Sequence, residues 1–501
     1  MPAMETTITE RWADFLTTFT FDDIPAEVLQ QTKVHILDSI GCSLGGYALE
    51  WGKKVAAVGR DLGGKPEATV IGSGDRLHCA HAAYVNGKLS NILDMDETMY
   101  QTRHIGGVPL FTALAVGERV GATGKEIILA TVLAYDLGAR SALCGSIWRP
   151  DPEKGVVSSL YGSSGFNTLA AAAAAAGIFK FDREEMINVL GVAAYLATGA
   201  IESKFSFTPP SNFNKSADMG WFCLGGVMAA LCARNGFVGD PSILDGPRGL
   251  AALVGALEFD DDTFVADLGK RWYIMDAGFK PYPTCRWFHN SVGLLEGIIK
   301  KHGLKPGDID SITVNTHPLG ITLPTYAAAD NWAGSTGKEL WFSQFSLSYA
   351  LACTVYGITP GPEWAREETL KSPRITEMTK KISHGEHPDA VRMVATWSGH
   401  PGKLFSQPPA SIEVKSKKGR FTADSTDIPG DTWNPGARLT DDAIVAKFRN
   451  NASYVLGDAQ IDRIIDAVMG LDRIKNARDF TGLLSPQAPA KRTSRRREAS
   501  G

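Results

Sequence analysis

Hydrophobic residues recur at every third or fourth position from about residue 5 to residue 270, which is the spacing of amphipathic helices. The pattern is clearest in RWADFLTTF, EVLQQTKVHILDSIGCSLGG, GKEIILATVLAYDLGARSAL and EEMINVLGVAAYLATG. The run LAAAAAAAGIF, which begins at Leu169, combines high helix propensity with a smooth surface suited to close packing, so we expect a buried central helix there. We therefore predict a helical first domain over residues 1–276.

The pattern changes near residue 277. KPYPTCRWFHN is rich in proline, NSVGLLEGIIKKHG has the period of an amphipathic helix, and DIDSITVNTHP alternates as a half-buried strand does. Further on, IEVKS and RFTADS are two expected strands joined by a Lys-Gly turn. These features predict a second, smaller α+β domain over residues 277–432, which we call the lid domain.

Helical spacing returns after the turns of PGDTWNPG. DDAIVAKFRNNASYVL and AQIDRIIDAVMGLD predict helices over residues 433–486 that rejoin the first domain. Residues 487–501 are polar and basic, and we expect a disordered tail, with nucleic-acid contact or a targeting signal as the alternative. The predicted fold class is mainly α, a large all-helical domain with a smaller α+β domain.

Composition narrows the class of protein. The 501 residues are 44% hydrophobic, enough for a sizeable core, and 51 basic against 55 acidic residues leave a net charge of −4, so no overall field indicates a nucleic-acid or membrane-surface partner. Seven scattered cysteines without a C-x-x-C motif indicate reduced thiols rather than a zinc site. The acidic N-terminus is unlike a signal peptide, so we expect a soluble, cytoplasmic protein.

The densest polar cluster of the first domain is NILDMDETMYQTRHIGGVP. If the preceding helix continues through it, Asp94 and Thr98 share one helix face with His104 a short loop away, so that a carboxylate, a hydroxyl and an imidazole converge. The alternative is a helix C-terminus whose acids are solvated and whose histidine caps a neighbour.

Two further segments carry candidate chemistry. Lys215, in KFSFTPPSNFNKSADMG, is either a solvated flank of the next helix or a cation directed into a pocket. In KPYPTCRWFHN, Arg286 and His289 are three residues apart at the domain junction, where small ligands commonly bind, although a structural hinge is the alternative. SSLYGSSGFN is not a P-loop, and its glycines, Gly162 and Gly165, favour helix packing over anion binding.

Taken in order, the segments of the chain resemble the MmgE/PrpD family, which includes 2-methylcitrate dehydratase, cis-aconitate decarboxylase and iminodisuccinate epimerase. The resemblance rests on HILDSIGCSLGG, LDMDETMYQTRHIGGV, GSSGFNTLAAAAAAAGIF, NKSADMG with NGFVGDPSILDGPRG, KPYPTCRWFH, FSLSYALA and GDTWNPGARLTDDAIVAKF. It implies a helical domain with an α+β lid, a cofactor-free active site between them and a homodimer. It also implies site residues at Asp94, Thr98, His104, Lys215 and His289.

Two departures from the family pattern bear on the reaction. Val156 or Val157 stands where many relatives of the decarboxylase or dehydratase type carry another histidine, and NKSADMG replaces the usual pattern of a lysine, a basic or aromatic residue, a histidine and a glycine. The sequence therefore indicates the fold and the family more directly than it indicates the substrate.

We interpret the chain as a cofactor-independent lyase, without a metal, that abstracts a proton next to a carboxylate of a small di- or tricarboxylate and then loses water or carbon dioxide. His104 and Lys215 are the acid and base candidates, Asp94 orients or charges an imidazole, Thr98 takes part in a hydrogen bond, and Tyr161 is an additional proton donor.

Three residues, Arg103, Arg286 and His289, are expected to bind substrate carboxylates. An epimerase or isomerase of a small dicarboxylate is the alternative within enzymes, and a non-catalytic carboxylate-binding homologue is the alternative outside them.

Overall fold

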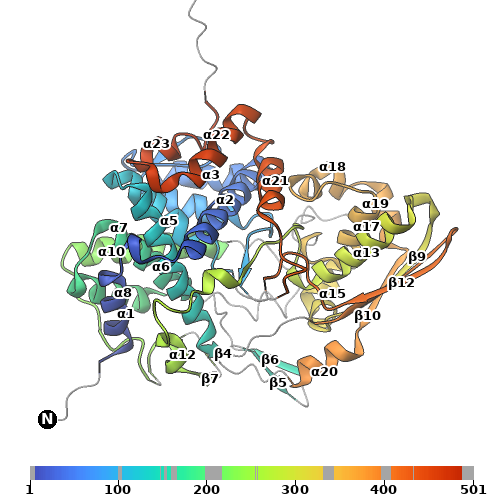
Figure 1. The fold of residues 1–501 in the computed structure, drawn as a ribbon, viewed down its shortest axis with the longest axis horizontal. Coiled ribbons are helices and arrows are strands. Elements are labelled where there is room, and N and C mark those ends of the chain that lie inside the picture. Colours follow the sequence, from blue (N-terminus) through green and yellow to red (C-terminus); the bar gives the residue numbers. More distant parts are fainter. Residues whose placement is uncertain are drawn as a thin grey trace, which may run out of the picture.

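The structure is a computed structural model (Figure 1). Two large clusters of buried hydrophobic residues organise the chain. One core contains buried residues from Ile8 to Ala277 and from Phe448 to Leu484, and the other runs from Tyr282 to Val414. The structure describes residues 6–99, 104–146, 148–151, 155–158, 166–197, 217–246, 248–253, 256, 258–330, 343–396, 408–432 and 434–487.

The first core belongs to a helical domain, as the hydrophobic spacing predicted. Capping boxes begin several of its helices; Thr123 and Glu126, for example, cap each other's backbone amides. The helices are α1 (Ile8–Thr18), α2 (Ala26–Ala48), α3 (Glu50–Leu62), α4 (Cys79–Ser90), α5 (Gly107–Val120), α6 (Gly124–Leu143), α7 (Asn167–Phe179), α8 (Arg183–Leu196), α10 (Ala217–Arg234), α11 (Leu250–Leu253), α12 (Asp261–Val265), α21 (Asp441–Ala452), α22 (Asp458–Met469) and α23 (Ala477–Thr481).

The alanine run forms the centre of this domain. All seven alanines of α7 are buried, and α7 packs against α5, α6, α8 and α10. The side chain that Gly226 lacks would overlap Ala171, so this glycine lets α10 approach α7 closely. The prediction of a buried central helix is confirmed.

The second core belongs to the α+β lid domain. Its sheet has the order β10 (Ile382–Glu386), β9 (Ile309–Thr316), β11 (Ala410–Ser416) and β12 (Gly419–Ser425), with β10 parallel to β9 and the other pairs antiparallel. The strands predicted in DIDSITVNTHP, IEVKS and RFTADS are confirmed. The helices are α13 (His289–His302), α14 (Leu319–Thr322), α15 (Pro324–Asp330), α17 (Leu347–Val355), α18 (Glu367–Leu370), α19 (Pro373–Thr379) and α20 (Pro388–Thr396).

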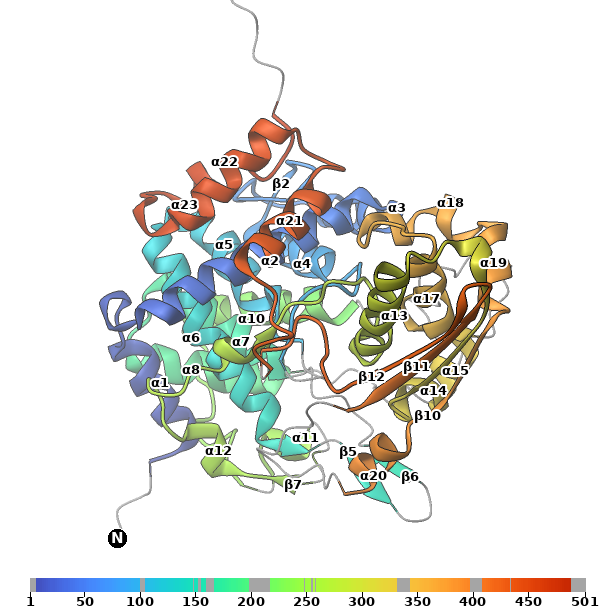
Figure 2. The ribbon, with the colours of Figure 1, turned by 45° about the vertical axis from the view of Figure 1, so that its right-hand side comes forward.

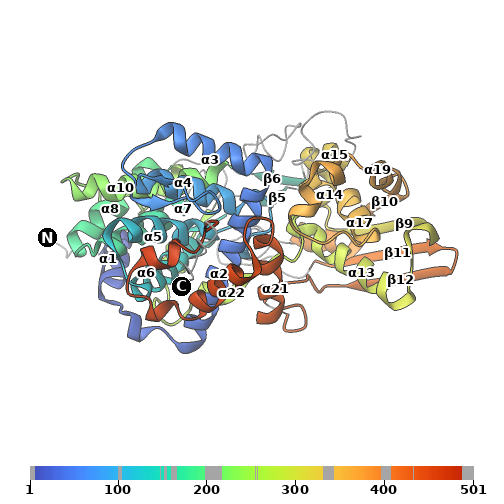
Figure 3. The same ribbon diagram turned by 90° about the horizontal axis from the view of Figure 1, so that it is seen from above.

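The C-terminal helices return to the helical domain. Helix α21 packs on α2, where an added Cβ at Gly41 would lie 2.9 Å from Cδ2 of Phe448. Figures 1 and 3 place α21 on the side of the helical domain that faces the lid domain. Helix α21 therefore packs close to the junction of the two domains.

Short strands also connect distant segments. Strand β3 (Thr98–Met99) of the helical domain pairs antiparallel with β8 (Ala277–Gly278), which lies at the start of the lid-domain segment. The hairpin of β5 (Trp148–Asp151) and β6 (Gly155–Ser158) reaches α20 of the lid domain (Figure 2). Two more pairs are β1 (Ala68–Thr69) with β2 (Arg76–Leu77), and β4 (Gly145–Ser146) with β7 (Glu258–Phe259). None of the described helices is both long enough and apolar enough to cross a bilayer.

Candidate active site

The polar cluster lies on the connection between α4 and α5, over residues 91–106. Helix α4 ends at Ser90, Asp94 has a left-handed backbone (φ 49°), and Thr98 lies in β3. The prediction of a helix continuing through Asp94 and Thr98 is therefore wrong. Asn91 follows the last helical residue, and its side-chain amide donates to Asp96 over 2.7 Å, so the chain folds back instead of adding helical turns.

His104 faces two carboxylates of this connection. Its Nδ1 donates a hydrogen bond to Oδ2 of Asp96 over 3.0 Å, and its Nε2 lies 4.0 Å from Oδ1 of Asp94. Both carboxylates are buried, whereas 18% of the imidazole side chain is exposed. Burial alone would raise the pKa of Asp96, but the charge and hydrogen bond of His104, with Lys280, outweigh it and hold that pKa below its usual value.

Lys280 is a site residue that the sequence interpretation missed. Its side chain is fully buried, and Nζ lies 3.1 Å from Oδ2 of Asp94. The β3–β8 pair explains the approach, because Thr98 lies opposite Gly278, two residues before Lys280. A lysine at the head of the Pro-rich segment KPYPTC was a signal in the sequence, since a stiff apolar segment rarely buries an ammonium group without a partner.

Arg286 reaches the same region but has a protein carboxylate as its partner. Its guanidinium forms an ion pair with Asp431, and both side chains are buried. An added Cβ at Gly278 would lie 2.7 Å from Nη2 of Arg286 and 2.9 Å from Oδ1 of Asp431, so glycine leaves room for the pair. The expected contact of Arg286 with a substrate carboxylate stays a prediction.

His289 begins α13 and is fully buried. Its Nε2 lies 3.1 Å from the carbonyl oxygen of Thr284, which requires that nitrogen to carry a proton. Burial, with the nearby charges of Arg286 and Lys280, holds the pKa of His289 well below its usual value, so this imidazole is neutral. Among the described residues, Nδ1 of His289 and Oγ1 of Thr98 have no hydrogen-bond partner.

Gln344, from the lid domain, ties the two domains together beside the cluster. Its side-chain amide donates to the backbone carbonyl of Ile92 over 2.6 Å. Its backbone carbonyl oxygen accepts hydrogen bonds from the hydroxyl of Thr284 and the backbone amide of Cys285. The connection that carries Asp94 and the segment that carries Lys280 and His289 are therefore held by one residue.

Glu97 supplies a third buried carboxyl group. The backbone amide of Gly106 donates to it, and the hydroxyl of Tyr135 donates over 3.1 Å. Burial, opposed by these two hydrogen bonds, raises the pKa of Glu97 to about 8. Glu97 therefore holds a proton at neutral pH, unlike Asp96 beside it.

Three predicted site residues, Arg103, Tyr161 and Lys215, lie outside the described residues, as do the side chains of Val156 and Val157. The structure brings together the other five, Asp94, Thr98, His104, Arg286 and His289, around the β3–β8 pair. It adds Asp96, Lys280 and Gln344 to them.

Two groups of side chains in the described part of the chain have the spacing of metal ligands. Asp94, Asp96 and His104 each bring a ligand atom within 4.8 Å of the others, with Lys280 already beside Asp94.

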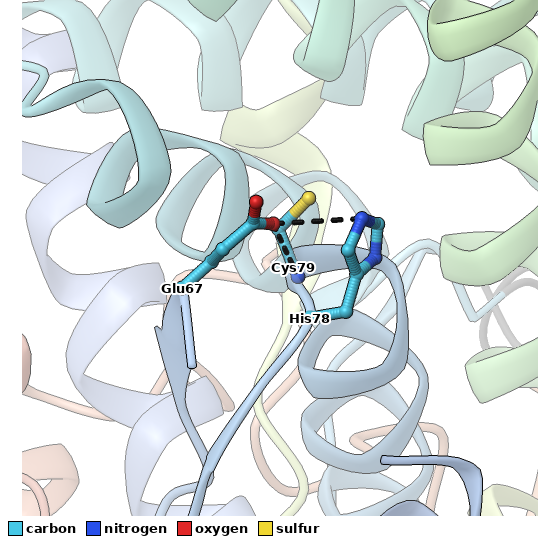
Figure 4. A group of neighbouring side chains, drawn as sticks. All are labelled: Glu67, His78 and Cys79. Carbon is cyan, nitrogen blue, oxygen red and sulfur yellow. Dashed lines mark hydrogen bonds and ion pairs between the residues drawn. The ribbon is translucent and has the colours of Figure 1, made fainter. Parts of the chain in front are cut away.

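The second metal-ligand group is Glu67, His78 and Cys79, away from the cluster (Figure 4). Nη1 of Arg119 lies 3.5 Å from both Oε2 of Glu67 and Sγ of Cys79, so an arginine provides the positive charge there. The geometry of this group is that of a structural ion pair at the start of α4.

Sequence models of known protein families identify the family of this chain. The sequence model of the MmgE/PrpD N-terminal domain matches residues 10–260, and that of the MmgE/PrpD C-terminal domain matches residues 282–471. The chain belongs to the MmgE/PrpD family.

Curated MmgE/PrpD-type relatives match nearly the whole chain. A cis-aconitate decarboxylase of Aspergillus terreus is 22% identical over 507 residues, covering 95% of this chain and 94% of that protein. The cis-aconitate decarboxylase of Mus musculus is 23% identical, covering 95% and 93%, and that of Homo sapiens is 22% identical, covering 96% and 95%. Membership of this family, with these relatives, identifies the chain as an enzyme of the MmgE/PrpD type.

Proposed function

We propose that this protein is a lyase that moves a proton to or from the carbon next to a carboxylate of a small di- or tricarboxylate. In loss of water, a base removes that proton and hydroxide leaves; in loss of carbon dioxide, the electron pair left on carbon takes up a proton from the acid form of a side chain. The observation that carries the proposal is the group of Asp94, Asp96, His104 and Lys280, in which buried charges surround one partly exposed imidazole. The names of the relatives favour decarboxylation of a substrate like cis-aconitate.

The chemistry requires both a base and positive charge. A carbon next to a carboxylate is weakly acidic, because the carbanion-like intermediate carries one more negative charge than the substrate. Each well-placed donor lowers such a barrier by about 2.7–4 kcal/mol. Lys280 is a buried cation beside Asp94 in the polar cluster, and we propose Lys215 as a second cation that stabilises the intermediate.

His104 is the proposed base. Its Nδ1–H is held by Asp96, which leaves the lone pair on Nε2, and the carboxylate stabilises the imidazolium that forms when Nε2 accepts a proton. Asp94 balances the charge of Lys280, and neutral His289 offers a hydrogen bond rather than a charge. These roles move a proton between the substrate carbon and Nε2 of His104 and need no cofactor.

The test is NMR of the purified protein in deuterated buffer with citrate, 2-methylcitrate, cis-aconitate and amino-dicarboxylates, one at a time. Loss of carbon dioxide or water from one of them, absent in His104→Ala, is the expected result. The matched control is His302→Ala, because His302 is a half-buried histidine stacked on Phe421 in the lid domain, with no contact to the polar cluster in this stack. Inversion or deuterium uptake without loss of a group would identify an epimerase, and no reaction with any substrate would favour a binding homologue.

We also propose that the protein is a homodimer that uses the outer face of α10. Trp221 and Met228, seven residues apart on that helix, are 51% and 43% exposed, and Phe237 and Val238 after the helix are exposed as well. Such an apolar stripe on a helix of a folded domain favours a protein partner. Sedimentation of the protein and of Trp221→Glu/Met228→Glu tests this, with a dimer expected for the first and a monomer for the second.

A further inference from the structure

Met95 separates Asp94 and Asp96 in the sequence, and two side chains of other helices donate to its backbone carbonyl. Nζ of Lys447, on α21, lies 2.7 Å from this oxygen, and Sγ of Cys42, on α2, lies 3.4 Å from it. The backbone at Met95 is therefore fixed by two helices, α2 near the start of the chain and α21 near its end.

Lys447 is a buried cation with a buried counterion. Nζ lies 2.7 Å from Oδ1 of Asp38, and the two side chains are 6% and 1% exposed. Burial alone would lower the pKa of Lys447, but Asp38, with Cys42 and Asp96, outweighs it and holds that pKa above its usual value. A buried ion pair commonly stabilises a fold no better than two apolar residues would, so stability alone gives little reason for it here.

The position of the carbonyl gives a reason. Asp94 has φ 49°, a conformation that costs a residue other than glycine roughly 1–3 kcal/mol and persists only where the surroundings enforce it. With the Met95 carbonyl fixed by Lys447, the side chains on its two sides are directed to Nε2 and Nδ1 of His104.

We infer that Lys447, held by Asp38, is a positioning residue that sets Asp94 and Asp96 around His104. The inference rests on the proposed function, because Lys447 affects catalysis only if His104 is the base. It also gives the C-terminal helices a part in the site, because α21 places its lysine on a connection 352 residues earlier in the chain.

The chain contains a matched control for this arrangement. Lys33 also pairs with an aspartate, Asp472, over 2.5 Å and donates to a methionine carbonyl, that of Met469, over 2.9 Å. This second pair joins α2 to the end of α22. The hydrogen bonds of Lys33 go to Met469 and Asp472, which lie far along the chain from the connection between α4 and α5.

The experiment compares Asp38→Asn/Lys447→Met with Lys33→Met/Asp472→Asn. Each double variant removes both charges, so neither leaves a buried charge unpaired. We expect the first to lose about 100-fold in kcat with a nearly unchanged KM, the scale of a small misplacement of catalytic groups, and the second to keep its kcat. Equal kcat values for the first variant and the unaltered enzyme overturn the inference.

A second readout needs no substrate. In protein labelled with ¹³C-histidine, the ring signals of His104 are identified by their loss in His104→Ala. We expect them to shift in Asp38→Asn/Lys447→Met and not in the control pair; unshifted signals in both contradict the inference. If the first double variant does not fold, Lys447→Arg replaces it, since the guanidinium keeps the charge opposite Asp38 but cannot place a donor where Nζ lies. For Lys447→Arg, a large fall in kcat supports the inference and an unaltered kcat overturns it.

An enzyme that converts none of the tested carboxylates contradicts the proposed function alone, because the ring signals still test the position of His104. If the unaltered protein converts a carboxylate and Asp38→Asn/Lys447→Met has the same kcat, only the positioning role of Lys447 is contradicted.

Discussion

Nδ1 of His104 and Oδ2 of Asp96 are 3.0 Å apart, with the carboxylate buried and the imidazole partly exposed. The relationship fixes which nitrogen carries the proton, because a carboxylate can only accept. It also sets the charge of the pair, since Asp96 stays ionised beside the histidine.

We expect His104→Ala to lower kcat by about 10²–10⁴-fold, the scale of a positioned acid or base, with a small change in melting temperature. Asp96→Asn keeps the shape of the site but removes the charge that stabilises the imidazolium, so it should lower kcat as well. Kinetics and thermal unfolding of the same preparations check both. Near-normal turnover in folded His104→Ala would remove the proposed base.

Lys215→Ala is expected to lower turnover by about 10²–10⁴-fold if this lysine faces the reacting carbon. Lys301→Ala serves as its control, because Lys301 is an exposed lysine in the last turn of α13. A folded Lys215→Ala enzyme with ordinary turnover on the true substrate would assign Lys215 to the flank of a helix.

Removal of Arg286 should first be seen in stability. Arg286→Ala leaves the carboxylate of Asp431 buried without its counterion, which costs about 3–5 kcal/mol in the free energy of unfolding. Arg286→Met/Asp431→Asn should recover most of that loss, as urea unfolding can measure. The KM of the double variant then tests the predicted substrate contact: a rise of tenfold or more supports it, and an unchanged KM assigns Arg286 to the domain junction.

Because the pKa of Glu97 is raised to about 8, we expect this residue to lower the free energy of unfolding as pH rises from 4.5 to about 8. The folded protein binds the proton of Glu97 up to a pH of about 8, whereas the unfolded chain releases it near 4.5, so the native state holds the extra proton between these values. The contribution is complete below pH 4.5 and is lost as pH rises through about 8, with a slope of about 1.4 kcal/mol per unit within the window. Glu97→Gln should lack this component when urea unfolding of both proteins is compared from pH 5 to pH 8.

We expect activity to survive exhaustive chelation. Asp94, Asp96 and His104 have metal-ligand spacing, but Lys280 already supplies a positive charge at Asp94. Turnover measured before and after dialysis against a chelator checks this. Activity that disappears and returns with one particular divalent ion would instead make the three side chains a metal site.

The sequence by itself determined the elements and the family. Period-3.6 spacing, the alanine run and the alternation in DIDSITVNTHP are local properties, so they predicted α7, β9 and the helical and α+β cores correctly. The polar cluster around His104 was also visible, because its acids and histidine are close in sequence. Its local shape was predicted wrongly, since the helical period of α4 gave no sign that Asn91 would turn the chain back onto Asp96.

Only the tertiary structure decided which charges meet. Lys280 reaches Asp94 because β3 pairs with β8, Arg286 meets Asp431 at the far end of the lid-domain segment, and Lys447 reaches Met95 from α21. Each contact joins residues more than 140 positions apart, and no periodic pattern encodes such a pair. The physical reason is that a buried charge is tolerated only beside its partner, and the partner is chosen by how the helices and strands pack, not by the spacing of either residue along the chain.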